Sequence, residues 1–418
     1  MSVTVTTLGN GLRVVTDRMD SVETVALGAW VGVGTRHETA EVNGISHLLE
    51  HMAFKGTRRR SAQKIAEEMD NVGGHLNAYT SRDHTAYFAK MLKEDTALAV
   101  DVIADILLES AMDPEELARE QHVVVQEIYQ ANDTPDDVIF DRFQATAYPD
   151  QPLGWPVLGS EEVVRAIDSP RLKRYLAEHY AAENMIVAAS GHIDHDAFAA
   201  QVERAFAPLR PAAAVIQAPA RYAGGEFRET RDLDQVHLLL GFPGVSYQDA
   251  DFYPAAAFSV LMGEGMSSRL FQEIREKRGL AYSVYSATQS FSDTGVFSIY
   301  VGTGPDDLPT LLPVLTAEIR KAADTITPEE TRRAKAQLKS SLLMSLESPS
   351  SRCNQCARQL AIYGRPLTTA EIIEKVEAVD AAAIAAAAGR IFSGAPTMAS
   401  IGQLDRLPTL EEFHAGLR

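Results

Sequence analysis

The chain carries two histidines and a glutamate at a spacing that suits metal chemistry: His47, Glu50 and His51, in the segment His-Leu-Leu-Glu-His. Glycines flank this segment and no proline interrupts it, so it is predicted to be a helix. Helical spacing puts the three side chains and Phe54 on one face. Two imidazoles one turn apart can hold one zinc ion, and a neighbouring glutamate can take a proton from a water that the zinc binds. The opposite face is apolar and comprises Ile45, Leu48, Leu49 and Met52.

A third metal ligand is expected from a second predicted helix. Asp113-Pro114-Glu115-Glu116 is typical of a helix start, with aspartate as the N-cap and proline in the first turn. Glu120 and Glu127 lie two turns apart on one face of this helix, largely opposite its apolar positions. A carboxylate facing the histidine helix would complete a His, His, Glu set with a fourth position open, as in catalytic zinc sites. The pattern alone leaves open that both glutamates are ordinary solvated residues.

Composition narrows the classes of protein to consider. The 418 residues exceed one typical domain, and 45% hydrophobic and 23% charged residues are typical of a globular chain. A net charge of −18 argues against nucleic-acid binding. The absence of a long apolar run argues against membrane insertion, and the absence of a signal peptide favours a cytoplasmic location. Two cysteines, Cys353 and Cys356, exclude a disulfide framework, and buried or incidental thiols are favoured over a redox pair.

An internal repeat spans about half of the chain. Asp113-Pro114-Glu115-Glu116 matches Thr327-Pro328-Glu329-Glu330 at an offset of 214 residues, the difference between 327 and 113, and the same offset pairs Pro135 with Pro349. Paired strand-like segments precede a helical segment in both halves. These strands are expected at 75–80 and 85–89 in the first half, and at 281–287 and 295–301 in the second.

Each half is therefore predicted to be an α+β domain, the two having arisen by duplication. The expected divisions are a zinc-binding catalytic domain at 1–210, a linker at 211–228 and a homologous domain without metal at 229–418. At the repeat offset, Glu120 corresponds to Ala334 and Glu127 to Ser341. The counterpart of the histidine helix, at 253–263, contains no histidine. The candidate ligands are thus confined to one copy, as expected if they act together.

Several motifs together resemble the insulinase and mitochondrial processing peptidase family of zinc metallopeptidases, of the pitrilysin type. The nearest likeness is to its short, two-domain bacterial members, and it covers nearly the whole chain. The motifs are the segments 44–57, 73–81 and 267–282, with Glu120 and Glu127 between them. The family implies two α/β-sandwich-like domains that form half of a clamshell.

The resemblance implies roles for residues of the first half. His47, His51 and Glu127 would bind one Zn²⁺ per chain, although manganese or cobalt can also occupy such a set. Glu50 would be the general base. Glu120 would orient a ligand histidine by accepting its second N–H.

The resemblance also implies substrate contacts. Asn77, Ala78 and Tyr79 would form an edge strand on which an extended peptide aligns, and Phe54 would line a pocket beyond the cleaved bond. A turn role for Asn77 and a core role for Phe54 stay open. Arg275 and Tyr282 of the second half would donate hydrogen bonds to the substrate carbonyl and to the developing oxyanion.

The function expected is a zinc-dependent endopeptidase that cleaves short or unfolded peptides in a closed chamber. A two-domain chain supplies half of such a chamber, so a homodimer with its active site completed across chains is expected. The alternative is a non-catalytic subunit, or one that depends on a different partner chain in a heteromeric processing peptidase. A metal-storage or sensor role has only the His and Glu set in its favour.

Overall fold

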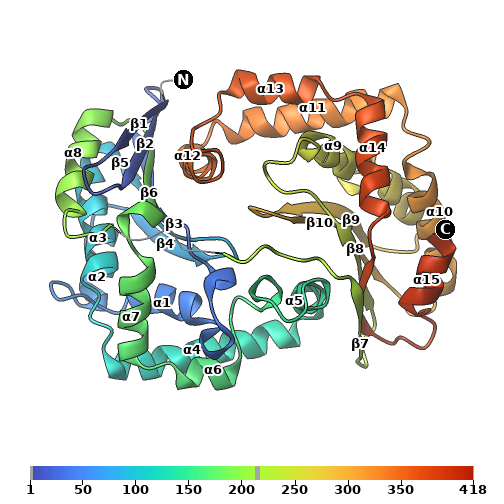
Figure 1. Ribbon diagram of the computed structural model, residues 1–418, viewed down its shortest axis with the longest axis horizontal. Coiled ribbons are helices and arrows are strands. Elements are labelled where there is room, and N and C mark those ends of the chain that lie inside the picture. The colour runs from blue at the N-terminus through green and yellow to red at the C-terminus, as the bar shows by residue number, and fades with distance from the viewer. Residues whose placement is uncertain (1–2, 212–216, 418) are drawn as a thin grey trace. The chain divides into compact units, whose positions relative to one another are not determined.

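The computed structural model describes residues 3–211 and 217–417, which form two compact units. The described residues of 1–129, 155–218 and 344–367 make up the first unit, and the rest make up the second. Figure 1 labels most of the elements of both.

The first unit is built on a six-stranded mixed sheet with strand order β1-β2-β6-β3-β5-β4. Strands β2 and β6 are parallel, and the other neighbours are antiparallel. The central strand β3 is buried on both faces, which is why its sequence is continuously apolar. The strands are β1 (Val3–Thr7), β2 (Arg13–Arg18), β3 (Thr24–Val31), β4 (His75–Thr80), β5 (Thr85–Leu92) and β6 (Met185–Gly191).

Helices cover both faces of this sheet. One core cluster joins alternate residues of β3 to α1, α3, α4, α7 and α8, and a second cluster joins the remaining alternate residues to α12. In Figure 1, α12 is seen end-on beside the sheet. The helices are α1 (Ile45–Ala53), α2 (Ala62–Asp70), α3 (Thr96–Leu108), α4 (Pro114–Asp133), α6 (Glu161–Ala166), α7 (Ser169–His179), α8 (His195–Ala205) and α12 (Pro349–Tyr363).

The second unit has a five-stranded sheet with strand order β7-β11-β8-β10-β9. Its strands are β7 (Gly225–Thr230), β8 (Val236–Pro243), β9 (Ser283–Ser290), β10 (Gly295–Thr303) and β11 (Thr397–Gly402). Its helices are α5 (Pro135–Ala147), α9 (Phe252–Gly263), α10 (Leu308–Ala322), α11 (Pro328–Ser345), α13 (Thr369–Glu377), α14 (Ala381–Phe392) and α15 (Leu410–Leu417), together with a π-helix, Phe271–Glu276.

The two sheets share one topology. If β1 is set aside, β2-β6-β3-β5-β4 of the first unit corresponds strand by strand to β7-β11-β8-β10-β9 of the second, including a single parallel pair at the same place. Helices α1, α3 and α4 correspond in chain order to α9, α10 and α11. The predicted α+β fold and its internal duplication are confirmed.

Each unit also contains one helix from the other half of the sequence. Helix α5 packs on β11, β8 and β7 of the second sheet, and α12 packs on β6, β3 and β2 of the first. Pro135 and Pro349, paired by the repeat offset, each begin one of these helices. The predicted domains, 1–210 and 229–418, keep each helix with its own half, so the compact units differ from them at α5 and α12. The linker at 211–228 stays a prediction, and its residues 212–216 lie outside the described residues.

The two cysteines lie on α12 and face the first sheet. Both are free and buried. Burial raises the pKa of the Cys356 thiol to about 12 and that of Cys353 well above its usual value, so neither forms a thiolate readily. This agrees with the expectation of buried thiols. No helix within 3–211 or 217–417 is long and apolar enough to cross a lipid bilayer.

Candidate metal centre

Helix α1 is fixed by its apolar face. Ile45, Leu48, Leu49 and Met52 are each at most 1% exposed and join the first unit's core. Each such side chain stabilises the fold by roughly 1.5–3 kcal/mol relative to an exposed position. This burial sets the rotation of the helix, so the face that carries the histidines must point away from the core.

The start of α1 is held by a buried carboxylate, Glu38. Its Oε2 accepts hydrogen bonds from the backbone N–H of Gly44 at 2.8 Å and from Asn43 Nδ2 at 2.9 Å, and its Oε1 accepts one from the N–H of Ser46 at 2.9 Å. Gly44 has a φ of 97°, which favours glycine, so the N-cap itself offers no side chain. Glu38 therefore satisfies two of the free N–H groups at the start of the helix and places a carboxyl group at the positive end of its dipole.

Three potential metal-binding atoms converge beside α1. Glu127 Oε2 of α4 lies 3.6 Å from His47 Nε2 and 3.5 Å from His51 Nε2. Among the residues that the structure describes, these three form the one group of His, Cys, Asp or Glu side chains close enough to share a metal. The structure thus brings together the three residues predicted as ligands.

The chemistry of these donors fits zinc. Zinc bonds of about 2.0–2.1 Å in tetrahedral geometry place ligand atoms roughly 3.3 Å apart, close to the separations seen here. Burial, and then the neighbouring His51, lower the pKa of His47 to about 3, so its imidazole is neutral and free to bind a metal at neutral pH. Two histidines and one carboxylate leave a fourth position for water or substrate.

His51 is oriented by a buried glutamate on α4. Its Nδ1 lies 3.0 Å from Glu120 Oε2, and the other Glu120 oxygen lies 2.7 Å from Lys55 Nζ. Glu120 is only 5% exposed, so its carboxylate needs partners inside the protein. Lys55 provides a positive charge beside it, in addition to the contact with His51. If His51 donates its Nδ1–H to Glu120, its Nε2 is left as the acceptor that faces Glu127. That Glu120 orients a ligand histidine stays a prediction.

Glu50 lies on the same helix face and is held by the edge strand β4. Thr80 donates its hydroxyl to Glu50 Oε2 at 2.6 Å. Burial raises the pKa of Glu50, and the Thr80 hydrogen bond opposes that shift. Thr80 thus binds Oε2 of Glu50 and makes no hydrogen bond with Oε1.

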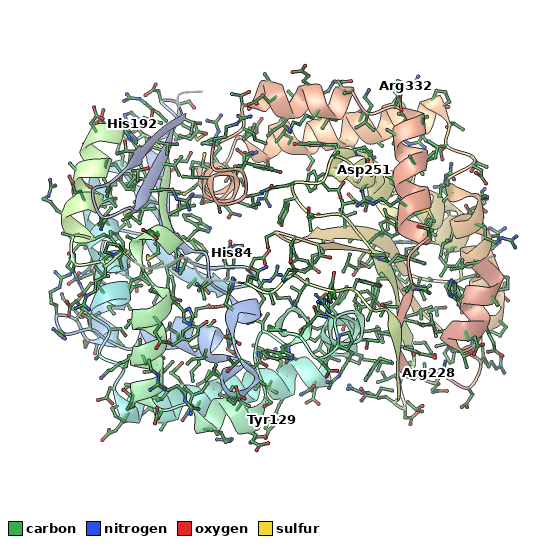
Figure 2. All side chains as sticks on the ribbon, in the orientation of Figure 1. His84, Tyr129, His192, Arg228, Asp251 and Arg332 are labelled. Atoms are coloured by element: carbon green, nitrogen blue, oxygen red, sulfur yellow. The ribbon has the colours of Figure 1, made fainter. Side chains whose placement is uncertain are left out.

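Strand β4 lies at one edge of the first sheet and carries Asn77, Ala78 and Tyr79. The side chain of Asn77 accepts a hydrogen bond from the N–H of Ala78 at 2.8 Å, a local role of the kind left open from the sequence. Tyr79 shares a hydrogen bond of 2.9 Å with His84, which Figure 2 labels beyond the end of β4. The predicted edge strand is present, because β4 ends the strand order and, among the described strands, pairs with β5 alone.

Phe54 follows the last residue of α1 and is half-buried. It packs against the first unit's core, with its ring centroid 6.4 Å from that of Tyr87. These contacts support the core role considered from the sequence, and the pocket role stays a prediction.

Arg275 and Tyr282 are brought together in the second unit. The Arg275 guanidinium carbon lies 4.7 Å from the Tyr282 ring centroid. Tyr282 is 75% exposed. In the same unit α9 occupies the position of α1 in the shared topology and carries no histidine. That the second domain binds no metal stays a prediction.

Sequence reasoning missed three residues that support this centre: Glu38, Lys55 and Thr80. Two of them left a signal. Lys55 lies one turn after His51, and Thr80 falls on the same alternating face of β4 as the core residue Ala78. Glu38 gave none, because its partners at the start of α1 depend on a loop conformation.

Comparison with known proteins places the chain in a family. Residues 13–161 match the model "Insulinase (Peptidase family M16)" and residues 166–338 match "Peptidase M16 inactive domain". A protein of Rickettsia felis named "Uncharacterized zinc protease" is 41% identical over 95% of this chain and 97% of its own length. A Bacillus subtilis protein named "Uncharacterized zinc protease YmxG" is 37% identical over 96% of this chain and 99% of its own length.

An Arabidopsis thaliana protein named as a probable mitochondrial-processing peptidase subunit beta is 35% identical over 98% of this chain and 80% of its own. Among solved structures, a protease from Helicobacter pylori has a TM-score of 0.89 at 23% identity and covers 96% of this chain and 99% of its own. That likeness confirms the fold. The family matches and the relatives together show that this chain belongs to the insulinase family of peptidases, family M16.

Proposed function

We propose that this protein is a zinc-dependent endopeptidase that cleaves short or unfolded peptides. The observation that carries the proposal is the convergence of His47 Nε2, His51 Nε2 and Glu127 Oε2 beside an independently held carboxylate, Glu50. Relatives named zinc proteases support the same chemistry. His47, His51 and Glu127 would hold a zinc ion, which when bound would supply a Lewis acid that lowers the pKa of water.

Glu50 is proposed as the general base. Its Oε1 would take the proton of the attacking water, and the resulting carboxylic acid would return that proton to the leaving amine. Burial supports this role because it raises the pKa of Glu50 and makes the carboxylate a stronger proton acceptor. Thr80 keeps the carboxylate from turning, since it fixes the other oxygen.

The edge of β4 is proposed to align the substrate. A peptide that pairs with this edge would form a backbone ladder with β4 and select little by side chain. The N–H of Ala78, which donates to the Asn77 side chain, would donate to a carbonyl oxygen of the bound peptide instead. Phe54 would line the pocket beyond the cleaved bond.

Arg275 and Tyr282 are proposed to contact the substrate from the second domain of a partner chain, in a homodimer that encloses a chamber. The guanidinium N–H groups of Arg275 and the hydroxyl of Tyr282 are available as hydrogen-bond donors. Within the described parts of the chain, neither makes a hydrogen bond or an ion pair through its side chain. An arginine donates to carbonyl oxygens, and a phenol can donate to an oxyanion.

The test is cleavage of a mixed fluorogenic peptide set by the parent chain, by Glu50→Gln and by Glu115→Gln. Glu115 is an exposed glutamate of α4 and serves as the matched control. Loss of a general base is expected to lower kcat by about 10²–10⁴-fold while the zinc content stays at one ion per chain. Cleavage by Glu50→Gln at the parental rate would show that the base is misassigned.

The size of the purified chain in solution tests the assembly. An active homodimer supports the proposal. A zinc-loaded monomer without activity that becomes active with a different chain would instead identify a partner-dependent subunit.

A further inference from the structure

The segment that joins α9 to β9, residues 264–282, contains one arginine, Arg275, whose surroundings differ from those of the other cations. Among the described residues, three of the four cations in this segment have carboxylate partners, and Arg275 has none. The paired cations are Arg269, which binds Glu330, and Lys277 and Arg278, which both bind Glu273. A cation left unpaired in an acidic protein with a net charge of −18 calls for a physical reason.

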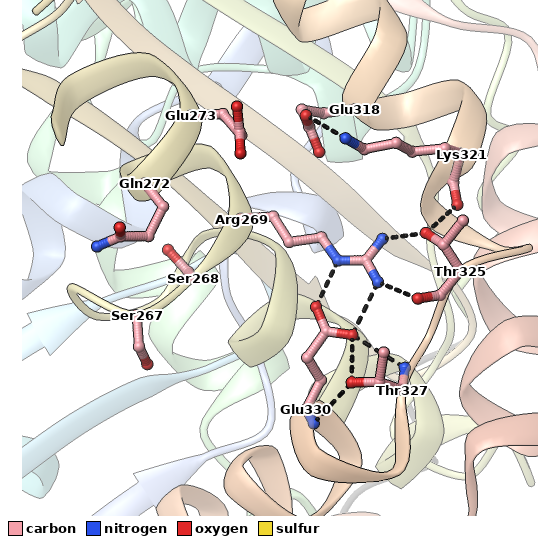
Figure 3. A pocket seen from close by; sticks show the side chains of 10 residues that line it. All are labelled: Ser267, Ser268, Arg269, Gln272, Glu273, Glu318, Lys321, Thr325, Thr327 and Glu330. Carbon is pink, nitrogen blue, oxygen red and sulfur yellow. Dashed lines mark hydrogen bonds and ion pairs between the residues drawn. The ribbon is translucent and has the colours of Figure 1, made fainter. Parts of the chain in front are cut away.

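The paired cations anchor the segment. Figure 3 shows the Arg269 guanidinium directed at Glu330 and Thr325. The three residues line a hollow of about 430 Å³. Arg269 makes a bidentate pair with Glu330 at 2.7 and 2.9 Å and donates to the Thr325 carbonyl at 2.8 Å. Lys321 neutralises Glu318 on the same wall. Each of these charges has its partner, so the hollow fixes the start of the segment and offers no free charge to a ligand.

Arg275 is held by aromatic rings. Its guanidinium carbon lies 4.8 Å from the ring centroid of Phe271 and 4.7 Å from that of Tyr282. Phe271 and Arg275 both belong to the π-helix, whose wider turn is common at functional sites. A ring face attracts the cation without occupying its N–H groups. A carboxylate would have neutralised the charge and used two of the five donors.

We infer that Phe271 is a positioning residue that holds Arg275 with its donors free for the carbonyl oxygens of a bound peptide. The inference rests on the proposed function, in which Arg275 contacts substrate. Phe271 itself touches no substrate and acts through the arginine. Lysine at 275 would not substitute, because an ammonium lacks the planar face that stacks on a ring and the fork that spans two acceptors.

The experiment measures peptide binding and turnover when the ring is removed. Phe271→Leu keeps an apolar side chain but loses the ring face. The expected result is about three- to tenfold weaker binding of a fluorescent peptide to the zinc-loaded Glu50→Gln chain, the range of a partly exposed cation–π contact. In the otherwise unchanged chain, KM should rise by a similar factor with kcat less affected. Phe271→Trp keeps a ring face and should bind peptide as the parent does.

A double-mutant cycle separates positioning from simple packing. In an Arg275→Gln background, Phe271→Leu should have no further effect on peptide binding, because the group it positions is gone. Arg278→Gln is the matched control, since it removes one positive charge three residues away that is already paired with Glu273. Should Phe271→Leu fail to fold, Phe271→Met carries the same comparison.

The outcomes are distinct. Unchanged binding and KM in Phe271→Leu, or the same loss with and without Arg275, overturns the inference while leaving the peptidase in place. A parent chain that neither cleaves nor binds any peptide overturns the proposed function, and the inference with it.

Discussion

Replacement of Glu38 by alanine tests whether a buried carboxyl group holds the start of α1, the helix that carries the candidate metal ligands His47 and His51. Glu38 is 3% exposed and accepts from two backbone N–H groups at the start of α1 and from the side chain of Asn43. The substitution leaves these donors without an acceptor, at a cost of about 1–3 kcal/mol for each buried backbone group. Burial raises the pKa of Glu38, so removal also relieves a desolvation cost, and water can enter the space. A net loss of about 2–4 kcal/mol is therefore expected.

The assay can report the first unit alone. The chain has two tryptophans, Trp30 and Trp155, and both lie in that unit. Urea unfolding followed by tryptophan fluorescence should show a lower midpoint for Glu38→Ala with an unchanged slope. Glu41→Ala, an exposed position three residues along, is the control and should stay within about 0.5 kcal/mol of the parent. Parental stability of Glu38→Ala would refute the capping argument.

The pH dependence of the same measurement has a definite sign. A carboxyl whose folded-state pKa is raised binds more protons in the folded than in the unfolded state. The contribution of Glu38 is therefore greatest below its ordinary pKa of 4.5 and falls as the pH rises through its folded-state pKa. Glu38→Gln should remove this decline, which would appear as a difference between the two pH profiles above pH 4.5.

Three further predictions follow from the hydrogen bonds and ion pairs of both units. Thr80→Val should lower kcat about tenfold at unchanged zinc content, because Glu50 loses its donor, and Thr80→Ser should restore it; steady-state kinetics checks this. Glu120→Ala should weaken zinc binding about 10–100-fold, measured by competition with a chelator. Burial alone would raise the pKa of Glu330, but hydrogen bonds, among them one from Arg269, lower it to about 2. The ionised Glu330 therefore stabilises the folded state above pH 4.5, and this contribution is lost as the pH falls to 2. Arg269→Gln should therefore be less stable than the parent at pH 7 by circular dichroism, with a difference that shrinks below pH 4.5.

Local sequence signals predicted the elements that carry the ligands. The apolar spacing of α1 and the Asp113-Pro114 start of α4 are both properties of a few consecutive residues, and both helices form where expected. Asp113 Oδ1 accepts from the N–H of Glu115 at 2.8 Å, as an N-cap should. The contact between Glu127 and the two histidines depends on tertiary packing, which local signals do not predict. The family resemblance predicted it.

Features that depend on distant parts of the chain were not predictable in the same way. Helices α5 and α12 have ordinary local signals, and nothing in 3.6-residue periodicity says which sheet an amphipathic helix will cover. The sequence also does not show that Arg275, among the described residues, has no carboxylate partner. Arg269, Arg275 and Arg278 are all arginines of one segment, and only the structure shows which of them bind a glutamate. Burial of Glu38 follows from the loop before α1, where no periodic pattern applies.

The second copy offers a physical reason why Glu120 has no acidic counterpart there. Glu120 of α4 and Ala334 of α11 occupy the same turn of equivalent helices, and both are buried, at 5% and 1% exposure. A glutamate is tolerated there in the first unit because His51 and Lys55 both contact it. Helix α9 of the second unit carries no histidine, so a carboxylate at 334 would lack that partner, and an unpaired buried charge is strongly destabilising. Once the histidines are absent, an apolar residue at this position is the stable choice. A carboxylate at this position would need both a hydrogen-bond donor and a cation, as His51 and Lys55 provide for Glu120.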